Sequence, residues 1–191
     1  MSSHETSVIL FYNFKRMLNK AHTDRLIEEL QVMQQRLDGL VGEPAAFRVE
    51  VPAGQLIQLM QSLKTAEWGW FDHLSCLTAL DRGTDQVPRF RVLYHLLSYP
   101  FELELEVSCA VPERDGRWVL PSVSQLWPTA QWHEREAYDL FGIHFVGNSD
   151  LRRLFMPDDW SGHPLRRDYV DPDFYHGVAV GYYDTSSEPS A

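Results

Sequence analysis

Residues 101–111 read Phe101-Glu102-Leu103-Glu104-Leu105-Glu106-Val107-Ser108-Cys109-Ala110-Val111, with an apolar side chain at every odd-numbered position. Most even-numbered positions are acidic or small. Because successive side chains of a strand point to opposite faces of a sheet, this alternation predicts a strand with one buried and one solvated face. The three glutamates would share the solvated face, where Arg89 and Arg91 of the preceding strand could lie opposite them.

The segments around this strand alternate between helical and strand-like periodicity. The expected helices are 26–37, 56–63 and 129–141, and the expected strands are 47–51, 71–80 and 90–96. The first two helical segments repeat apolar residues at intervals of three and four, and the third is expected from its flanking residues Thr129 and Gly142. The strand segments are rich in alternating or β-favouring residues. This order predicts an α+β fold, in which helices pack on a mixed or antiparallel sheet.

Capping residues and turns support these boundaries. Thr23 or Asp24 could cap the first helix, and Gly39 follows its expected end. Thr129 could cap the last helix, and Gly142 would terminate it. A turn over 112–116 would close the meander that contains the central strand.

Beyond the last helix the sequence loses its periodicity but stays apolar. Phe145, Phe155 and Trp160 are scattered among glycines and prolines over residues 143–169. Such a long irregular segment is unusual in a compact monomer, so we expect it to bury its apolar side chains against its own domain or another chain. We therefore predict a globular domain over 1–142, an extended subunit-binding arm over 143–175 and a flexible acidic tail over 176–191, because the tail has too few apolar residues to order itself.

Composition excludes several classes of protein. The chain has 191 residues and a formal net charge of −10, which disfavours binding to nucleic acid or anionic lipid. Two cysteines are too few for a disulfide framework, a four-cysteine zinc site or a cysteine-bound iron–sulfur cluster. No stretch approaches the roughly 20 apolar residues of a transmembrane helix.

A dense group of charges lies among aromatic residues near the end of the expected domain. Four carboxylates lie among aromatic residues in the sequence: Glu134, Glu136, Asp139 and Asp168. Burying a charge costs several kcal/mol unless the charge is paired, so we expect these carboxylates to pair with arginines of the arm. Ordinary exposed pairs at helical i,i+4 spacing are the alternative.

Catalytic interpretations have less support. His133, Glu136 and His144 could form a two-histidine, one-carboxylate metal site of a free-standing hydrolase, but no H-E-x-x-H helix pair is present. Glu134 and Glu136 are two residues apart and would point to different faces of a helix, which disfavours a glycosidase pair. The chain has no G-x-S-x-G, G-x-G-x-x-G or Walker A motif.

The charged motif continues into the arm and carries a resemblance to a known family. The matching segments are Glu134-Arg135-Glu136-Ala137-Tyr138-Asp139-Leu140-Phe141-Gly142, Leu151-Arg152-Arg153 and Pro164-Leu165-Arg166-Arg167-Asp168-Tyr169. In this order and spacing they resemble the thirty-kilodalton subunit of proton-translocating NADH-quinone oxidoreductase, which is respiratory complex I. The resemblance covers residues from about 45 to about 170, whereas residues 1–40 match no part of the family pattern.

This resemblance implies a structural or assembly subunit of the hydrophilic arm of complex I. The chain would hold no catalytic residue, metal or cofactor, and would support electron transfer from NADH to quinone through FMN and iron–sulfur clusters in partner subunits. Its main partner would be the large D-type chain, which helps to line the quinone site, with neighbouring iron–sulfur subunits. The complex would lie on the cytoplasmic side of the bacterial inner membrane, with this chain peripheral to it.

The resemblance also identifies candidate interface residues, with the arginines as charged anchors and Phe155 and Trp160 as apolar ones. They are Glu134, Arg135, Glu136, Tyr138, Asp139, Phe141, Arg152, Arg153, Phe155, Trp160, Arg166, Arg167, Asp168 and Tyr169. An equivalent subunit of a ferredoxin-linked or hydrogenase-type relative, an assembly factor and the metal-dependent hydrolase remain alternatives.

Overall fold

The computed structural model describes residues 3–36, 40–43 and 47–180. Its main sheet has five strands in the order β1-β2-β5-β4-β3. These strands are β1 Val41–Glu43, β2 Arg48–Val51, β3 His73–Asp81, β4 Phe90–Ser98 and β5 Leu103–Ala110. The neighbours β3, β4 and β5 are antiparallel, and β2 pairs with β5 in parallel, so the predicted α+β fold with a mixed sheet is confirmed.

The central strand β5 has the predicted alternation, but its charges pair differently from the prediction. Arg91 lies opposite Ala110 in the register and binds Glu50 of β2 at 2.6 and 2.9 Å. Glu106 pairs instead with Arg48 at 3.6 Å. The expected pairing of the arginines of β4 with the glutamates of β5 is therefore wrong, because the parallel strand β2 brings its own charged residues beside β5.

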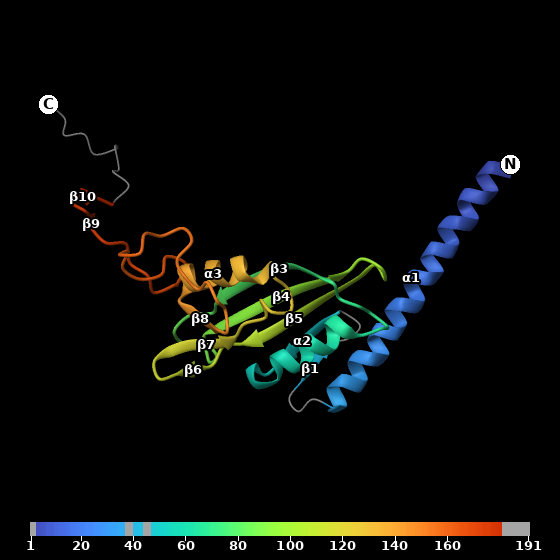
Figure 1. Cartoon of the computed structure of the whole chain (residues 1–191), viewed down its shortest axis with the longest axis horizontal. Coiled ribbons are helices and arrows are strands. Elements are labelled where there is room, and N and C mark those ends of the chain that lie inside the picture. The colour runs from blue at the N-terminus through green and yellow to red at the C-terminus, as the bar shows by residue number, and fades with distance from the viewer. Residues whose placement is uncertain (1–2, 37–39, 44–46, 181–191) are drawn as a thin grey trace.

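The described residues form three α-helices: α1 Ser3–Arg36, α2 Leu56–Thr65 and α3 Ala130–Phe141. Helices α2 and α3 lie against the sheets, whereas α1 meets the domain at its C-terminal part and extends away from it toward the N-terminus (Figure 1). A 3₁₀ turn, Ala53–Gln55, leads into α2. Thr23 and Asp24 lie inside α1, so the predicted N-terminal cap is wrong. No proline or glycine precedes Gly39 in the sequence, and nothing local interrupts the helix. Gly39 itself lies outside the described residues.

A second, three-stranded sheet carries the end of the domain. It consists of β6 Glu113–Arg114, β7 Arg117–Pro121 and β8 Ile143–Val146, in that order. The prediction of irregular structure from residue 143 is wrong for the first four residues, because Ile143 and Phe145 are buried, whereas His144 and Val146 are exposed. This alternation spans only four residues between Gly142 and Gly147, so the sequence around it looks irregular. The arm therefore begins at Gly147.

The arm ends in a small hairpin, β9 Phe174–Tyr175 and β10 Val178–Ala179. The hairpin lies at the opposite end of the molecule from the N-terminus (Figure 1). Residues 176–180, part of the predicted tail, thus include a strand, and the rest of that tail, residues 181–191, lies outside the described residues.

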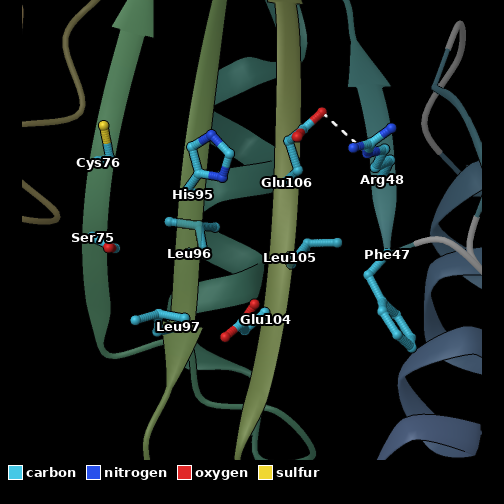
Figure 2. Close-up of a pocket in the computed structure, with 10 residues that line it drawn as sticks. All are labelled: Phe47, Arg48, Ser75, Cys76, His95, Leu96, Leu97, Glu104, Leu105 and Glu106. Atoms are coloured by element: carbon cyan, nitrogen blue, oxygen red, sulfur yellow. Dashed lines mark ion pairs between the residues drawn. The ribbon is translucent and has the colours of Figure 1, made fainter.

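Helix α2 covers one face of the main sheet with four fully buried side chains, whereas the opposite face is hollowed (Figure 2). The hollow measures about 630 Å³. Cys76, His95, Glu106 and Arg48 lie opposite one another across neighbouring strands there. None of these four residues belongs to the predicted interface set, so the hollow and the arm are separate features.

Candidate functional site

Helix α3 is the element on which the candidate site is built. It begins at Ala130, as predicted, but Thr129 makes no side-chain capping bond to the helix, and its hydroxyl lies 3.4 Å from the carbonyl oxygen of Leu74. Gly142 ends the helix in the left-handed conformation, with φ of 73°, which glycine adopts without a steric penalty. The helix turns Glu134, Arg135 and Asp139 inward, and all three are buried.

Asp139 holds the arm by four hydrogen bonds. Its Oδ2 accepts the backbone N–H groups of Leu154, Phe155 and Met156 at 3.0, 2.7 and 2.9 Å. Its Oδ1 accepts Arg153 Nη1 at 2.9 Å, which confirms the predicted pairing of this carboxylate with an arginine of the arm. Burial alone would raise the pKa of Asp139, but the three N–H groups and the guanidinium hold it below its usual value.

The arm also satisfies the end of helix α3. The last four carbonyls of a helix have no partner within it, and they form the negative end of its dipole. Here Gly142 N donates to Tyr138 O, His163 Nδ1 lies 2.8 Å from Asp139 O and Leu165 N donates to Leu140 O. The fourth, Phe141 O, accepts Arg166 Nε at 2.6 Å.

Gly142 has a second role at this junction. A Cβ atom at this position would lie 2.5 Å from His163 Nε2 and closer still to the Arg166 guanidinium, so a larger residue would have to displace the two side chains that bind the carbonyls at the helix end. Burial lowers the pKa of His163. A neutral imidazole donating from Nδ1 fits this site beside two arginines.

The far part of the arm is fixed to the main sheet by ion pairs. Asp168 binds Arg89, the residue directly before β4, and Arg89 also binds Asp81 of β3 at 2.8 Å. Asp81 additionally accepts the backbone N–H of Arg167 at 2.9 Å. Burial opposes the ionisation of Asp81, but these donors lower its pKa to about 2. The prediction that Asp168 pairs with an arginine of the arm is wrong, because the arm folds over the main sheet and Asp168 meets Arg89 there.

Glu134 also departs from the prediction. It is fully buried and accepts Ser122 Oγ, Val123 N and Asn148 Nδ2 at 2.7, 2.8 and 2.7 Å, and no arginine among the described residues pairs with it. Burial raises its pKa, and these hydrogen bonds oppose only part of that rise. Glu134 therefore ties the beginning of the arm to the 122–124 loop.

The other charged residues of the motif divide between internal and exposed positions. Arg135 is buried and donates to the carbonyls of Arg152 and Arg153 at 3.3 and 3.1 Å, with its guanidinium 4.7 Å from the Trp132 ring. Glu136 is exposed and has no hydrogen-bond or ion-pair partner in the described part of the chain, so its predicted pairing is wrong.

Aromatic members of the candidate set mostly pack within the chain. Trp160 Nε1 donates to Tyr169 Oη at 3.0 Å, and both residues are half-buried. Phe141 packs edge-to-face on Phe90 of β4 at 6.3 Å. Tyr138, also half-buried, packs edge-to-face on His144 at 6.3 Å.

A set of arm side chains remains exposed after these contacts are made. Their exposed fractions are 64% for Phe155, 53% for Leu165, 82% for Val170, 65% for Phe174 and 70% for Val178. Arg152 is exposed and pairs with the neighbouring Asp150 at 2.8 Å, and the side chain of Arg167 is also exposed. The candidate residues therefore separate into an internal clasp, which fixes the arm, and an outward surface, which can contact another chain.

Several residues of the clasp lie outside the predicted set, among them Asp81, Arg89, Ser122, Asn148 and His163. His163 lies two residues before Leu165 in the arm, and its proximity to the arginine pairs could have marked it. The contact between Arg89 and Asp168 joins residues separated by 79 positions, and no local pattern predicts it.

In the structure, His133, Glu136 and His144 do not form the alternative metal site. In the described residues, no group of three histidine, cysteine, aspartate or glutamate side chains is placed to hold a metal ion. His133 and Glu136 lie on α3, whereas His144 lies on β8 and packs against Tyr138. Over the same residues, no helix is long and apolar enough to span a membrane.

Several curated proteins are similar to this chain in sequence. The C subunit of the Moorella thermoacetica NADH-quinone oxidoreductase is 42% identical over 76% of this chain and 94% of its own length. That of Chloroherpeton thalassium is 44% identical, and the alignment covers 59% of this chain but only 45% of the relative. A C/D subunit of the Phocaeicola vulgatus enzyme is 42% identical over 64% of this chain and 22% of its own length.

Two solved structures share the fold. A trypsin-resistant fragment (1-134) of Nqo5 superposes with a TM-score of 0.55 at 33% identity, covering 68% of this chain and 99% of the fragment. A chain of the archaeal membrane-bound sulfane sulfur reductase has a TM-score of 0.61 at 23% identity, covering 75% of this chain and 84% of that one.

The family model of the respiratory-chain NADH dehydrogenase 30 Kd subunit matches residues 49–175, which include the main sheet from β2 onward, helix α3 and most of the arm. This match confirms the resemblance in the charged motif, and the chain belongs to the 30 Kd subunit family of the respiratory-chain NADH dehydrogenase.

Proposed function

We propose that this chain is a structural and assembly subunit of the hydrophilic arm of a proton-translocating NADH:quinone oxidoreductase. It docks through the outward surface of its C-terminal arm and carries no catalytic residue of its own. Electrons pass from NADH to quinone through FMN and iron–sulfur clusters held by partner subunits. The assembled complex lies at the cytoplasmic side of the bacterial inner membrane, and this chain is peripheral to it.

The observation that carries this proposal is an arm clasped to its own domain with apolar side chains facing outward. Phe155, at 64% exposed, lies within the turn that Asp139 holds, so its backbone is already ordered. Ordering a loop before binding reduces the entropic cost of association. Aromatic side chains that fill pockets contribute strongly to interfaces, which fits Phe155 as an anchor.

The large D-type chain at the quinone site is the partner we favour. The Phocaeicola vulgatus relative bears the double designation C/D, which is what a chain joining the two subunits would carry. A partner covalently joined in one organism is a reasonable neighbour in another. Iron–sulfur subunits next to it are secondary partners.

An equivalent place in a ferredoxin-linked or hydrogenase-type complex is the second candidate. The similarity in fold to a chain of the sulfane sulfur reductase favours it, since that protein is described as an archaeal respiratory membrane complex. The two candidates differ in the electron donor and in the subunits that accompany this chain.

Affinity purification of the tagged chain from detergent-solubilised membranes, followed by mass spectrometry, tests the proposal. We expect the D-type chain and the NADH-oxidising subunits in stoichiometric amounts. Ferredoxin- or hydrogenase-type partners would support the second candidate. Recovery of the chain without any oxidoreductase subunit would contradict both.

A matched pair of variants tests the docking surface itself. Phe155→Ser should lower the amount of D-type chain recovered, because it removes an exposed aromatic anchor. Val87→Ser makes a comparable change at a side chain that is 95% exposed in the β3–β4 loop, and it should leave recovery unchanged. Equal recovery with both variants would remove Phe155 from the interface.

A further inference from the structure

The hairpin that ends the arm presents apolar side chains on both of its faces. His176 and Gly177 form its turn with φ of 49° and 79°, the two positive values typical of a type I′ turn. The register pairs Tyr175 with Val178 and Phe174 with Ala179. Because alternate residues of a strand point to opposite faces, Phe174 and Val178 project on opposite sides of the ribbon.

Side-chain contacts fix this hairpin to the arm. A two-stranded ribbon of this length is not stable alone in water. The Tyr175 ring lies 4.9 Å from that of Trp160, and its hydroxyl donates to Asp159 Oδ1 at 2.9 Å. His176 Nε2 lies 2.8 Å from the other oxygen of Asp159. These contacts use Tyr175 and His176, and they leave Phe174 and Val178 exposed.

The same segment carries uncompensated negative charge. Between Asp168 and Val180 there are three aspartates and neither lysine nor arginine. Arg89 neutralises Asp168. Asp171 and Asp173 are exposed, and in the described part of the chain neither side chain has a hydrogen-bond or ion-pair partner. With Val170, which is 82% exposed, they form a surface that is both acidic and apolar.

We propose that residues 170–179 insert into an apolar groove with a lysine- and arginine-lined rim on another subunit of the complex. This inference rests on the proposed function, since it takes the partner from the same complex. A groove fits better than a flat surface, because apolar side chains project from both faces of the ribbon. A basic rim would pair with Asp171 and Asp173, whereas an anionic lipid surface would repel them.

A charge-neutralising variant tests the rim. In the tagged full-length chain within the assembled complex, Asp171→Asn with Asp173→Asn removes both free charges. The control, Glu67→Gln with Glu113→Gln, removes two exposed charges remote from the arm in sequence. The measurement is retention of the partner subunits over a series of NaCl concentrations, because salt screens exposed charges.

We expect the double aspartate variant to lose its partners about three- to tenfold more readily at low salt and to show a flatter salt dependence. The control should follow the wild-type curve. A wild-type salt profile in the aspartate variant would overturn the inference. If Phe155→Ser still releases the partner in that case, the proposed function stands, whereas absence of oxidoreductase subunits from the wild-type purification would overturn the function itself.

Phe174→Ser tests the apolar groove. It should weaken retention at every salt concentration, with Val87→Ser as its control. The same pair is applied to the full-length chain mixed with phosphatidylcholine–phosphatidylglycerol vesicles, where we expect no binding by the wild type. Binding to vesicles that Phe174→Ser abolishes would overturn the subunit groove in favour of a lipid surface.

Discussion

Replacing Asp139 by asparagine removes the charge that clasps the arm to helix α3 while keeping the shape of the side chain. The amide oxygen of asparagine can still accept the N–H groups of Leu154, Phe155 and Met156. The amide nitrogen then faces Arg153 Nη1, which now lies 2.9 Å from the carboxylate and would meet a second donor. The variant therefore isolates the ion pair from the backbone hydrogen bonds.

The expected cost follows from the burial of the pair. Asp139 is fully buried, and the side chain of Arg153 is 15% exposed. Removing one partner of a buried ion pair typically costs about 3–5 kcal/mol. Arg153 keeps its bonds to the carbonyls of Trp160 and Gly162, so we expect the low end, about 3 kcal/mol. For a chain of this size that corresponds to a fall in Tm of about 6–12 °C.

Two measurements locate the loss. Urea unfolding gives the change in the free energy of unfolding, and hydrogen exchange reports the three backbone amides that Asp139 binds. If the arm opens locally, a loss of about 3 kcal/mol speeds their exchange about a hundredfold. Glu136→Gln, an exposed position on the same helix, should change stability by less than about 0.5 kcal/mol. Wild-type Tm and wild-type exchange of these amides in Asp139→Asn would refute the reasoning.

Three further variants probe the same clasp. Gly142→Ala should lower the free energy of unfolding measured by calorimetry by about 3 kcal/mol, because the new Cβ meets His163 and Arg166. The control Gly116→Ala, at a glycine with a similar φ but open space around it, should lower it by only about 1 kcal/mol. Equal losses in the two variants would contradict the steric argument. Glu134→Ala should lower the free energy of unfolding by about 2 kcal/mol, since it removes the acceptor that Ser122, Val123 and Asn148 share, whereas Glu134→Gln should lose about 1 kcal/mol. A smaller loss in the alanine variant than in the glutamine variant would disprove the anchoring role. The pKa of Asp81 is lowered to about 2, so the stability that ionised Asp81 contributes is complete above its pKa in the unfolded chain and is lost as the pH falls from about 4 to about 2. In Asp81→Asn, the free energy of unfolding in urea should therefore fall by about 2.5 kcal/mol less than in the wild type over that pH range. An acid profile that matches the wild type would contradict the role of Asp81 in the clasp.

The predictable part of the fold is the part encoded by short-range repeats. The alternation over residues 101–111 identified β5, and Gly142 marked the end of α3. These signals are local, since they depend only on which face of one element is buried. The strand β8 was not predicted, because its alternation spans only four residues.

Local sequence also determined the family and the composition of the candidate site. The charged motif and the arginine pairs stand in the order that the family model matches. The sequence could not decide which carboxylate pairs with which arginine, because a guanidinium can bind any buried carboxylate that it reaches. Asp139 found its partner in the arm, whereas Glu134 found a serine, an asparagine and a backbone N–H.

Tertiary structure alone decided which candidate residues face outward. Arg89 meets Asp168 only because the arm folds back over the sheet, across 79 positions of sequence. That fold uses Asp139, Arg153 and Asp168 in ion pairs within the chain, and it leaves Phe155, Phe174 and Val178 exposed. The sequence by itself determined which elements form and which family they belong to, because periodicity and motif order are local. The division between clasp and docking surface depends on contacts distant in sequence, which only the folded chain brings together.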